Sequence, residues 1–200
     1  MSKECHFFVN ATGPWTGITL ADQPNYCSAN FKELYISKKD VVILRGLSKE
    51  LLKLSSLEIQ NTKRKLWFDH NSLKSERPVI FVDPENGWNE IITEDLLGCE
   101  GRLARRWEYI LRKELFWGNY IKDDKPIEPY FYVGYTWSES DWGLSGEFHG
   151  GLDGGSYSWD ISIQNLNDCE KLKFKKINID YKSTLMTLEL ANCVFDGIIF

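Results

Sequence analysis

The chain has 200 residues, of which 42% are hydrophobic and 14% aromatic, enough to build a sizeable core and to exclude a disordered chain. Its net charge of -5 is modest and spread along the sequence, so the basic surface of a nucleic-acid binder is not expected. The five cysteines form no Cys-x-x-Cys pair, and no segment reaches the length of a membrane span. These features predict a cytoplasmic protein with reduced thiols and without a nucleic-acid or membrane partner.

The first part of the chain divides into a lead-in and a helical segment. Residues 1–40 show no sustained periodicity and predict an irregular lead-in. From Asp40 onward, leucines recur close to the 3.6-residue period of a helix. Ser55 followed by Glu58 is a capping-box pattern, which predicts a second helix ending near His70. Residues 41–75 are therefore assigned to a helical segment.

An apolar run at 78–82 predicts a buried strand, and the Asp-Pro and Asn-Gly pairs that follow it predict a loop over 83–90. Ligands bind at the carboxyl ends of strands in α/β sheets, so we expect the site in this loop. The loop offers two carboxylates that could exchange protons or bind cations, beside an aromatic wall. The alternative is a solvated loop that caps the next helix. The candidate residues are Glu85, Trp88, Asn89 and Glu90.

A long helix is predicted over 93–116, with Thr93 as its cap, and a second strand over 127–135. Two strands joined by one helix favour a right-handed parallel crossover. The loop after the second strand would then lie on the same face as the first loop. It adds Glu139 and Asp141 to the candidate site residues.

The glycine-rich stretch 144–160 predicts a β-hairpin. It carries Glu147, His149 and Asp153, whose spacing matches no established metal motif, so an exposed hairpin is the preferred interpretation. A short helix over 168–172, an extended segment over 172–179 and a last helix over 183–195 are predicted next. The final residues 198–200 look like the start of an apolar strand, which suggests a chain cut within a fold.

Five motifs, in this order and spacing, resemble the amino-terminal half of the uroporphyrinogen decarboxylase-like family, in its divergent bacterial branch. The first reads Leu-Trp-Phe-Asp-His-Asn-Ser-Leu, at 66–73. The others are Arg-Pro at 77–78, Gly-Trp-Asn-Glu at 87–90, Gly-Ser-Tyr-Ser-Trp at 155–159 and Cys-Glu-Lys-Leu at 169–172.

The resemblance implies an α/β fold in which residues 76–200 form the amino-terminal half of a (β/α)8 TIM-type barrel, after the helical segment. It further implies that the intact protein is a lyase or a corrinoid-linked methyltransferase acting on a tetrapyrrole-related substrate, with this chain alone inactive. Glu85, Trp88, Asn89 and Glu90 would line the substrate mouth, together with Glu139 and Asp141. The partner would be a small molecule or a corrinoid protein, and exposed barrel edges would favour self-association.

The loop at residues 83–90 differs from the corresponding loop of the family's decarboxylases. Family decarboxylases bind substrate carboxylates through arginines after the first strand, whereas residues 83–90 contain acids and no arginine. An acidic loop repels a polycarboxylate, which argues against the classical decarboxylation. Family methyltransferases hold zinc in their second half, so zinc is expected only through residues beyond this chain. The sequence does not identify the cofactor or the catalytic residues.

The aromatic residues between 130 and 159 support an alternative of another class, a carbohydrate- or flat-ligand-binding module without catalysis. Open rings would favour this binding module, and buried rings would favour the barrel. A noncatalytic interaction fragment is a third interpretation. The residues concerned are Tyr130, Tyr132, Tyr135, Trp137, Trp142, Tyr157 and Trp159.

Overall fold

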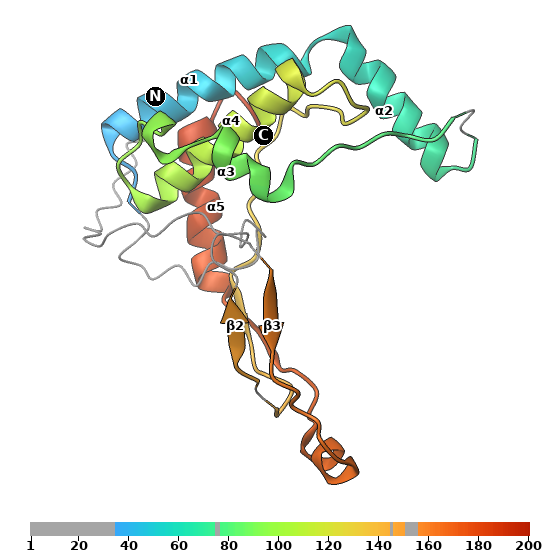
Figure 1. Ribbon diagram of the computed structural model, residues 1–200. Helices are drawn as coiled ribbons and strands as arrows, with labels where there is room; N and C mark the ends of the chain where they lie inside the picture. The colour runs from blue at the N-terminus through green and yellow to red at the C-terminus, as the bar shows by residue number, and fades with distance from the viewer. Residues whose placement is uncertain (1–34, 75–76, 145, 151–155) are drawn as a thin grey trace.

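The structure is a computed structural model that describes residues 35–74, 77–144, 146–150 and 156–200 (Figure 1). Most of the predicted lead-in lies outside these residues. The described part contains both helices and strands, with helices in the majority. The α-helices are α1 (Lys38–Ser55), α2 (Glu58–Asn71), α3 (Trp88–Ile91), α4 (Arg102–Tyr120) and α5 (Tyr181–Phe195). The 3-10 helices are η2 (Glu85–Gly87), η3 (Glu94–Leu96) and η5 (Leu166–Lys171), and the strands are β1 (Trp137–Glu139), β2 (Phe148–Gly150), β3 (Tyr157–Trp159) and β4 (Ile177–Ile179).

Helix α1 begins at a capping box of its own. The Ser37 side chain accepts from the Asp40 amide at 3.0 Å, and the Asp40 carboxylate accepts from the Ser37 amide at 3.1 Å. Its leucines Leu44 and Leu51 are buried, as the periodicity predicts. The predicted helix from Asp40 is thus confirmed.

The predicted capping box at the start of α2 is wrong. Ser55 is the last residue of α1, and its hydroxyl donates to the Leu52 carbonyl instead of capping α2. Helix α2 begins at Glu58 without a side-chain cap and ends at Asn71, close to the predicted end.

Helix α4 begins at Arg102, nine residues later than predicted. The amides just before it bond to carboxylates of α4 and α1, so they do not enter a helical ladder. Glu108 accepts from the Gly98 and Cys99 amides at 3.0 and 2.7 Å, and Asp40 accepts from the Glu100 amide at 2.8 Å. Tertiary hydrogen bonds therefore set the start of this helix.

The core lies where α1, α4 and α5 pack together (Figure 1). Trp107 of α4 packs on Phe195 of α5 with tilted rings whose centroids are 5.6 Å apart, and it meets Phe131 edge-on at 5.4 Å. A second aromatic group joins α3 to α4, since the Trp88 and Trp117 rings lie 5.3 Å apart. The predicted helical segment 41–75 thus shares one core with the residues that follow it.

The buried strand predicted at 78–82 is wrong. Ile80, Phe81 and Val82 are about half exposed, and the segment is extended without a strand partner in the described part of the chain. The Val82 amide donates to Asp123 at 3.0 Å, and the Ile80 amide to Asp124 at 2.8 Å. These carboxylates take the place of the neighbouring strand.

The strands form two antiparallel pairs. β1 pairs with β4, and β2 pairs with β3, which confirms the predicted hairpin. Figure 1 shows β2 and β3 extending away from the helices as an arm. The described residues contain no closed barrel and no parallel strand pair that joins 78–82 to 127–135.

The segment 127–135 is extended, and its pairing is with the last residues of the chain. The Phe200 amide donates to the Pro129 carbonyl at 3.1 Å, and the Phe131 amide donates to the Phe200 carbonyl at 2.6 Å. Phe200 thus bonds both Pro129 and Phe131, the two neighbours of Tyr130, which is the hydrogen-bond pattern of a parallel bridge between Tyr130 and Phe200. The two segments are connected through the arm and α5.

Three cysteines lie in the described part, Cys99, Cys169 and Cys193, and all three are free thiols, as expected. Among the described residues, no helix has the length and apolar character that crossing a membrane requires.

Two helical glycines give a test of the packing between α1 and α4. A Cβ on Gly118 would lie 2.4 Å from Leu54 Cδ2 and 2.8 Å from Ile127 Cγ1, whereas a Cβ on Gly46 meets nothing within 4 Å. We expect Gly118→Ala to lower the free energy of unfolding by about 1–3 kcal/mol through overpacking. The matched Gly46→Ala should raise it by about 0.5–1 kcal/mol, because glycine is a poor helix former. Urea denaturation of both variants measures the difference, and a shift of the same sign in both would contradict the α1–α4 contact.

Candidate functional site

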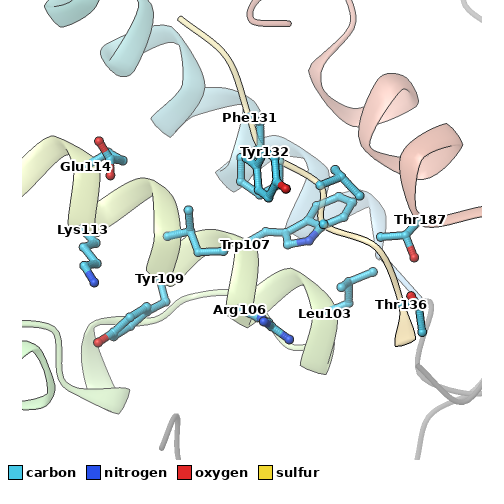
Figure 2. Close-up of a pocket in the computed structure, with 13 residues that line it drawn as sticks. Leu103, Arg106, Trp107, Tyr109, Lys113, Glu114, Phe131, Tyr132, Thr136 and Thr187 are labelled. Carbon is cyan, nitrogen blue, oxygen red and sulfur yellow. The ribbon is translucent and has the colours of Figure 1, made fainter. Parts of the chain in front are cut away.

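A cavity of about 230 Å³ lies between α4 and the extended residues 131–136 (Figure 2). Its apolar wall combines α4 side chains with side chains of the extended segment. Trp107 is only 4% exposed and packs edge-on against Phe131, so this part of the wall is fixed. Tyr132, in contrast, is 66% exposed and forms the open side of the cavity. The apolar wall consists of Leu103, Trp107, Ile110, Phe131, Tyr132 and Val133.

The polar groups around this cavity come from three elements. Arg106 and Lys113 are seven residues apart on α4, which places them on one side of the helix. Thr136 and Thr187 lie together near one end, as Figure 2 shows. Glu114, the acidic residue of the lining, is held in an ion pair with Lys125. The Lys113 ammonium lies over the Trp88 ring, 4.9 Å from its centroid, so Arg106 supplies the positive charge beside the aromatic wall. This combination favours a flat ligand that carries a negative charge.

Both threonines are held in place by the backbone. The Thr136 amide donates to Thr184 Oγ1 at 2.9 Å, and the Thr136 carbonyl accepts from the Asp180 amide at 2.8 Å. The Thr187 hydroxyl donates to the Ser183 carbonyl at 2.9 Å. These bonds attach the end of the extended segment to the first turns of α5 and so define one end of the cavity.

The predicted site loop 83–90 folds into η2 and α3 and lies apart from this lining. Trp88 is 2% exposed, its indole donates to Asp83 Oδ1 at 2.6 Å, and its ring packs edge-on against Phe116. Trp88 is therefore a core residue in this structure. Glu85, Asn89 and Glu90 are exposed.

The hydrogen bonds of this loop also act on Asp83. Burial alone would raise the pKa of Asp83, but the Glu85 amide and the Trp88 indole donate to its carboxylate and lower the pKa below its ordinary value. Glu85 has a φ of 52°, in the left-handed region, and its amide bonds Asp83 at 3.0 Å. Asp83 thus remains ionised and holds the loop against α3.

Glu139 is the last residue of β1, which pairs with β4, and Asp141 lies just after β1. Glu139 forms an ion pair with Lys175, next to β4. The Asp141 carboxylate accepts from the Gly143 amide at 2.8 Å, which closes a turn. The structure therefore does not place them with the residues of the loop 83–90, and a shared role in substrate binding stays a prediction.

The residues of the cavity were visible in the sequence but were assigned other roles. Trp107 is one of the apolar residues of the long helix, and Arg106 is one of its charged residues. Neither could be assigned to a cavity without the segment 131–136, which supplies the opposite wall.

A second cavity of about 440 Å³ lies at the carboxyl end of α5. It is bounded by Phe131 and Val133 on one side and by Leu188, Phe195 and the residues 196–200 on the other. Most of this lining is apolar, and its polar groups are Asn192 and Asp196. It offers less electrostatic selectivity for a ligand than the first cavity.

The comparisons with known proteins give no family assignment. No family model matches the chain, and neither the curated proteins nor the solved structures contain a match.

Proposed function

We propose that the chain is the amino-terminal portion of a (β/α)8-barrel protein similar to the uroporphyrinogen decarboxylases. The intact form is then a lyase or corrinoid-linked methyltransferase that acts on a tetrapyrrole-related substrate. The sequence motifs between 66 and 172 suggest this family, and this chain alone is expected to be inactive.

The observation that carries the proposal is the parallel pairing between 129–131 and Phe200. The connection between these segments includes α5, and Phe195 of α5 packs on Phe131 with ring centroids 4.7 Å apart. A parallel pair whose connection contains a helix packed on it is the repeating unit of α/β folds. The parallel bridge between Tyr130 and Phe200 supports such a unit, and it joins a different pair of segments from the one that the sequence predicted.

The cavity beside this unit supports a substrate with an aromatic ring and an acidic substituent. Trp107 and Tyr132 provide flat surfaces, and Arg106 provides positive charge. Its volume of about 230 Å³ is below the range of about 300–1,000 Å³ usual for drug-sized ligands. The cavity therefore suits one substituted ring of a tetrapyrrole, with the rest of the macrocycle outside.

Titration with coproporphyrin III and with hydroxocobalamin, followed by tryptophan fluorescence, tests the proposal. Saturable binding of either compound is expected, and Arg106→Gln should weaken it about tenfold, equivalent to about 1.4 kcal/mol. Lys53→Gln removes an exposed charge on α1 and serves as the matched control without an effect. Absence of binding up to millimolar ligand, or equal affinities of the two variants, would contradict the proposal.

A second candidate function is favoured by ring exposure. Tyr130, Tyr132, Tyr135, Trp142 and Trp159 are each more than half exposed. Open rings of this kind favour the carbohydrate- or flat-ligand-binding module. Binding of soluble oligosaccharides that is lost in Tyr130→Ala and Tyr132→Ala, without tetrapyrrole binding, would establish this alternative in place of the first.

A further inference from the structure

The hairpin β2–β3 brings together three side chains that can bind a metal ion. Glu147 precedes β2, His149 lies within β2, and Asp160 follows β3. In the hairpin register, His149 is opposite Ser158, and the Asp160 amide donates to the Glu147 carbonyl at 3.0 Å. Glu147 and Asp160 are therefore directly opposite each other on the two strands.

The strand geometry places all three side chains on one face. Alternate residues of a strand point to the same side, so Glu147 and His149 share a face, and a residue directly opposite Glu147 shares that face too. The ligand atoms of Glu147, His149 and Asp160 all lie within 4.8 Å of one another. His149 Nε2 is 3.0 Å from Asp160 Oδ1. The side chains converge on a volume that a single ion can fill.

The charges at this position favour a cation. Two carboxylates directly opposite each other on neighbouring strands destabilise the pair by like-charge repulsion. His149 adds an imidazole nitrogen beside the two carboxylates, 3.0 Å from Asp160 Oδ1. A divalent cation would relieve the repulsion between the carboxylates and take the imidazole nitrogen as a third ligand.

We propose that Glu147, His149 and Asp160 bind a divalent transition-metal ion of the zinc type. One imidazole nitrogen and two carboxylate oxygens form a donor set found in zinc sites, and imidazole selects against Mg²⁺ and Ca²⁺. All three residues are exposed, so the remaining coordination positions are occupied by water. The site lies on the arm, does not depend on the proposed tetrapyrrole function, and needs no residue beyond this chain.

The sequence did not indicate this ligand set because the third ligand is not the nearest acid. His149 and Asp160 are eleven residues apart and are brought together only by the hairpin pairing. Asp153, which the sequence offered as a co-ligand, lies outside the described residues.

Isothermal titration of the untagged full chain with ZnCl₂ at pH 7.5 tests the proposal. We expect one ion per chain with micromolar affinity, weakened at least tenfold in His149→Gln and in Asp160→Asn. His70→Gln, a histidine packed edge-on against Trp67 in α2, is the matched control and should bind as the unmodified chain does. Equal binding in His149→Gln, or no binding at millimolar zinc, would overturn the proposal.

Cobalt substitution separates this site from binding at thiols. Co²⁺ bound by imidazole and carboxylates gives weak ligand-field absorption, whereas cobalt at Cys169, which is exposed, would give intense thiolate charge-transfer bands. We expect the weak spectrum alone, and its loss in His149→Gln. Circular dichroism of each variant shows whether the hairpin change has altered the helices, and a thiolate spectrum would overturn the assignment.

Discussion

Replacing Glu108 with alanine is expected to lower the free energy of unfolding by about 3–5 kcal/mol, because the change breaks a buried ion pair. Glu108 has no exposed surface. Its carboxylate accepts from Arg112 Nε at 2.8 Å and from the Gly98 and Cys99 amides at 3.0 and 2.7 Å. Alanine would leave one charged donor and two amide donors without their acceptor. Urea denaturation of the purified variant measures the loss.

Acidification should remove the stabilisation that the Glu108 carboxylate provides. Burial alone would raise the pKa of Glu108, but the two amides and the Arg112 guanidinium lower the pKa below its ordinary value. The unfolded chain therefore takes up the proton first, and the stabilisation is complete above the ordinary pKa. It is lost as the pH falls through the lowered pKa. Glutamine has no titratable carboxyl group, so the stability of Glu108→Gln should depend less steeply on pH in this acidic range.

Glu50→Ala is the control for this effect. Glu50 is exposed on α1, so its replacement should change the free energy of unfolding by less than about 0.5 kcal/mol. A similarly small effect of Glu108→Ala would mean that the carboxylate does not hold residues 98–99 against α4.

Replacing Asp123 with alanine is expected to lower the free energy of unfolding by about 2–4 kcal/mol, since each buried donor left without an acceptor costs about 1–3 kcal/mol. Asp123 accepts from the Trp117 indole at 2.9 Å, from the Val82 amide at 3.0 Å and from the Lys125 amide at 3.1 Å. The Trp117 side chain is buried, so water does not replace this acceptor. Thermal unfolding followed by circular dichroism measures the overall loss.

Hydrogen exchange should also locate the effect in residues 79–84, whose amides lose the tether at Val82. Asp124→Ala is the comparison, because Asp124 binds the Ile80 amide and Arg77 at the more exposed end of the same segment. Its pKa is lowered to about 2 by the hydrogen bond from Arg77, so this contact is lost only when the pH falls through about 2. We expect Asp124→Ala to speed exchange near Ile80 with a smaller global loss. Slow exchange at Val82 in Asp123→Ala would contradict the proposed tether.

The elements that the sequence predicted correctly are those with strong local signals. α1 and α5 follow apolar periodicity, and the hairpin β2–β3 follows its glycines and alternating residues. The predicted strand at 78–82 failed because apolar composition does not reveal whether a partner strand is present. Its amides are bonded by Asp123 and Asp124, some forty residues further along the chain.

The candidate site was only partly predictable. Glu85, Asn89 and Glu90 are exposed, but they lie in η2 and α3 instead of the predicted loop. Trp88 packs in the core, because Phe116 and Trp117 of α4 cover its ring. The cavity at Trp107 forms because α4 and residues 131–136 face each other without filling the space between them. No local sequence pattern predicts such a space.

The sequence by itself determined α1, α2, α5, the hairpin β2–β3 and many of the apolar residues that build the core, since these depend on composition and on contacts between near neighbours. The tertiary structure alone decided where α4 begins, which segments pair in parallel, and which side chains converge at the cavity and on the hairpin. Carboxylates decided several of these points. Glu108, Asp40 and Asp123 each bind backbone amides outside their own helix or turn, and the free energy of such bonds depends on burial, which only the folded chain provides.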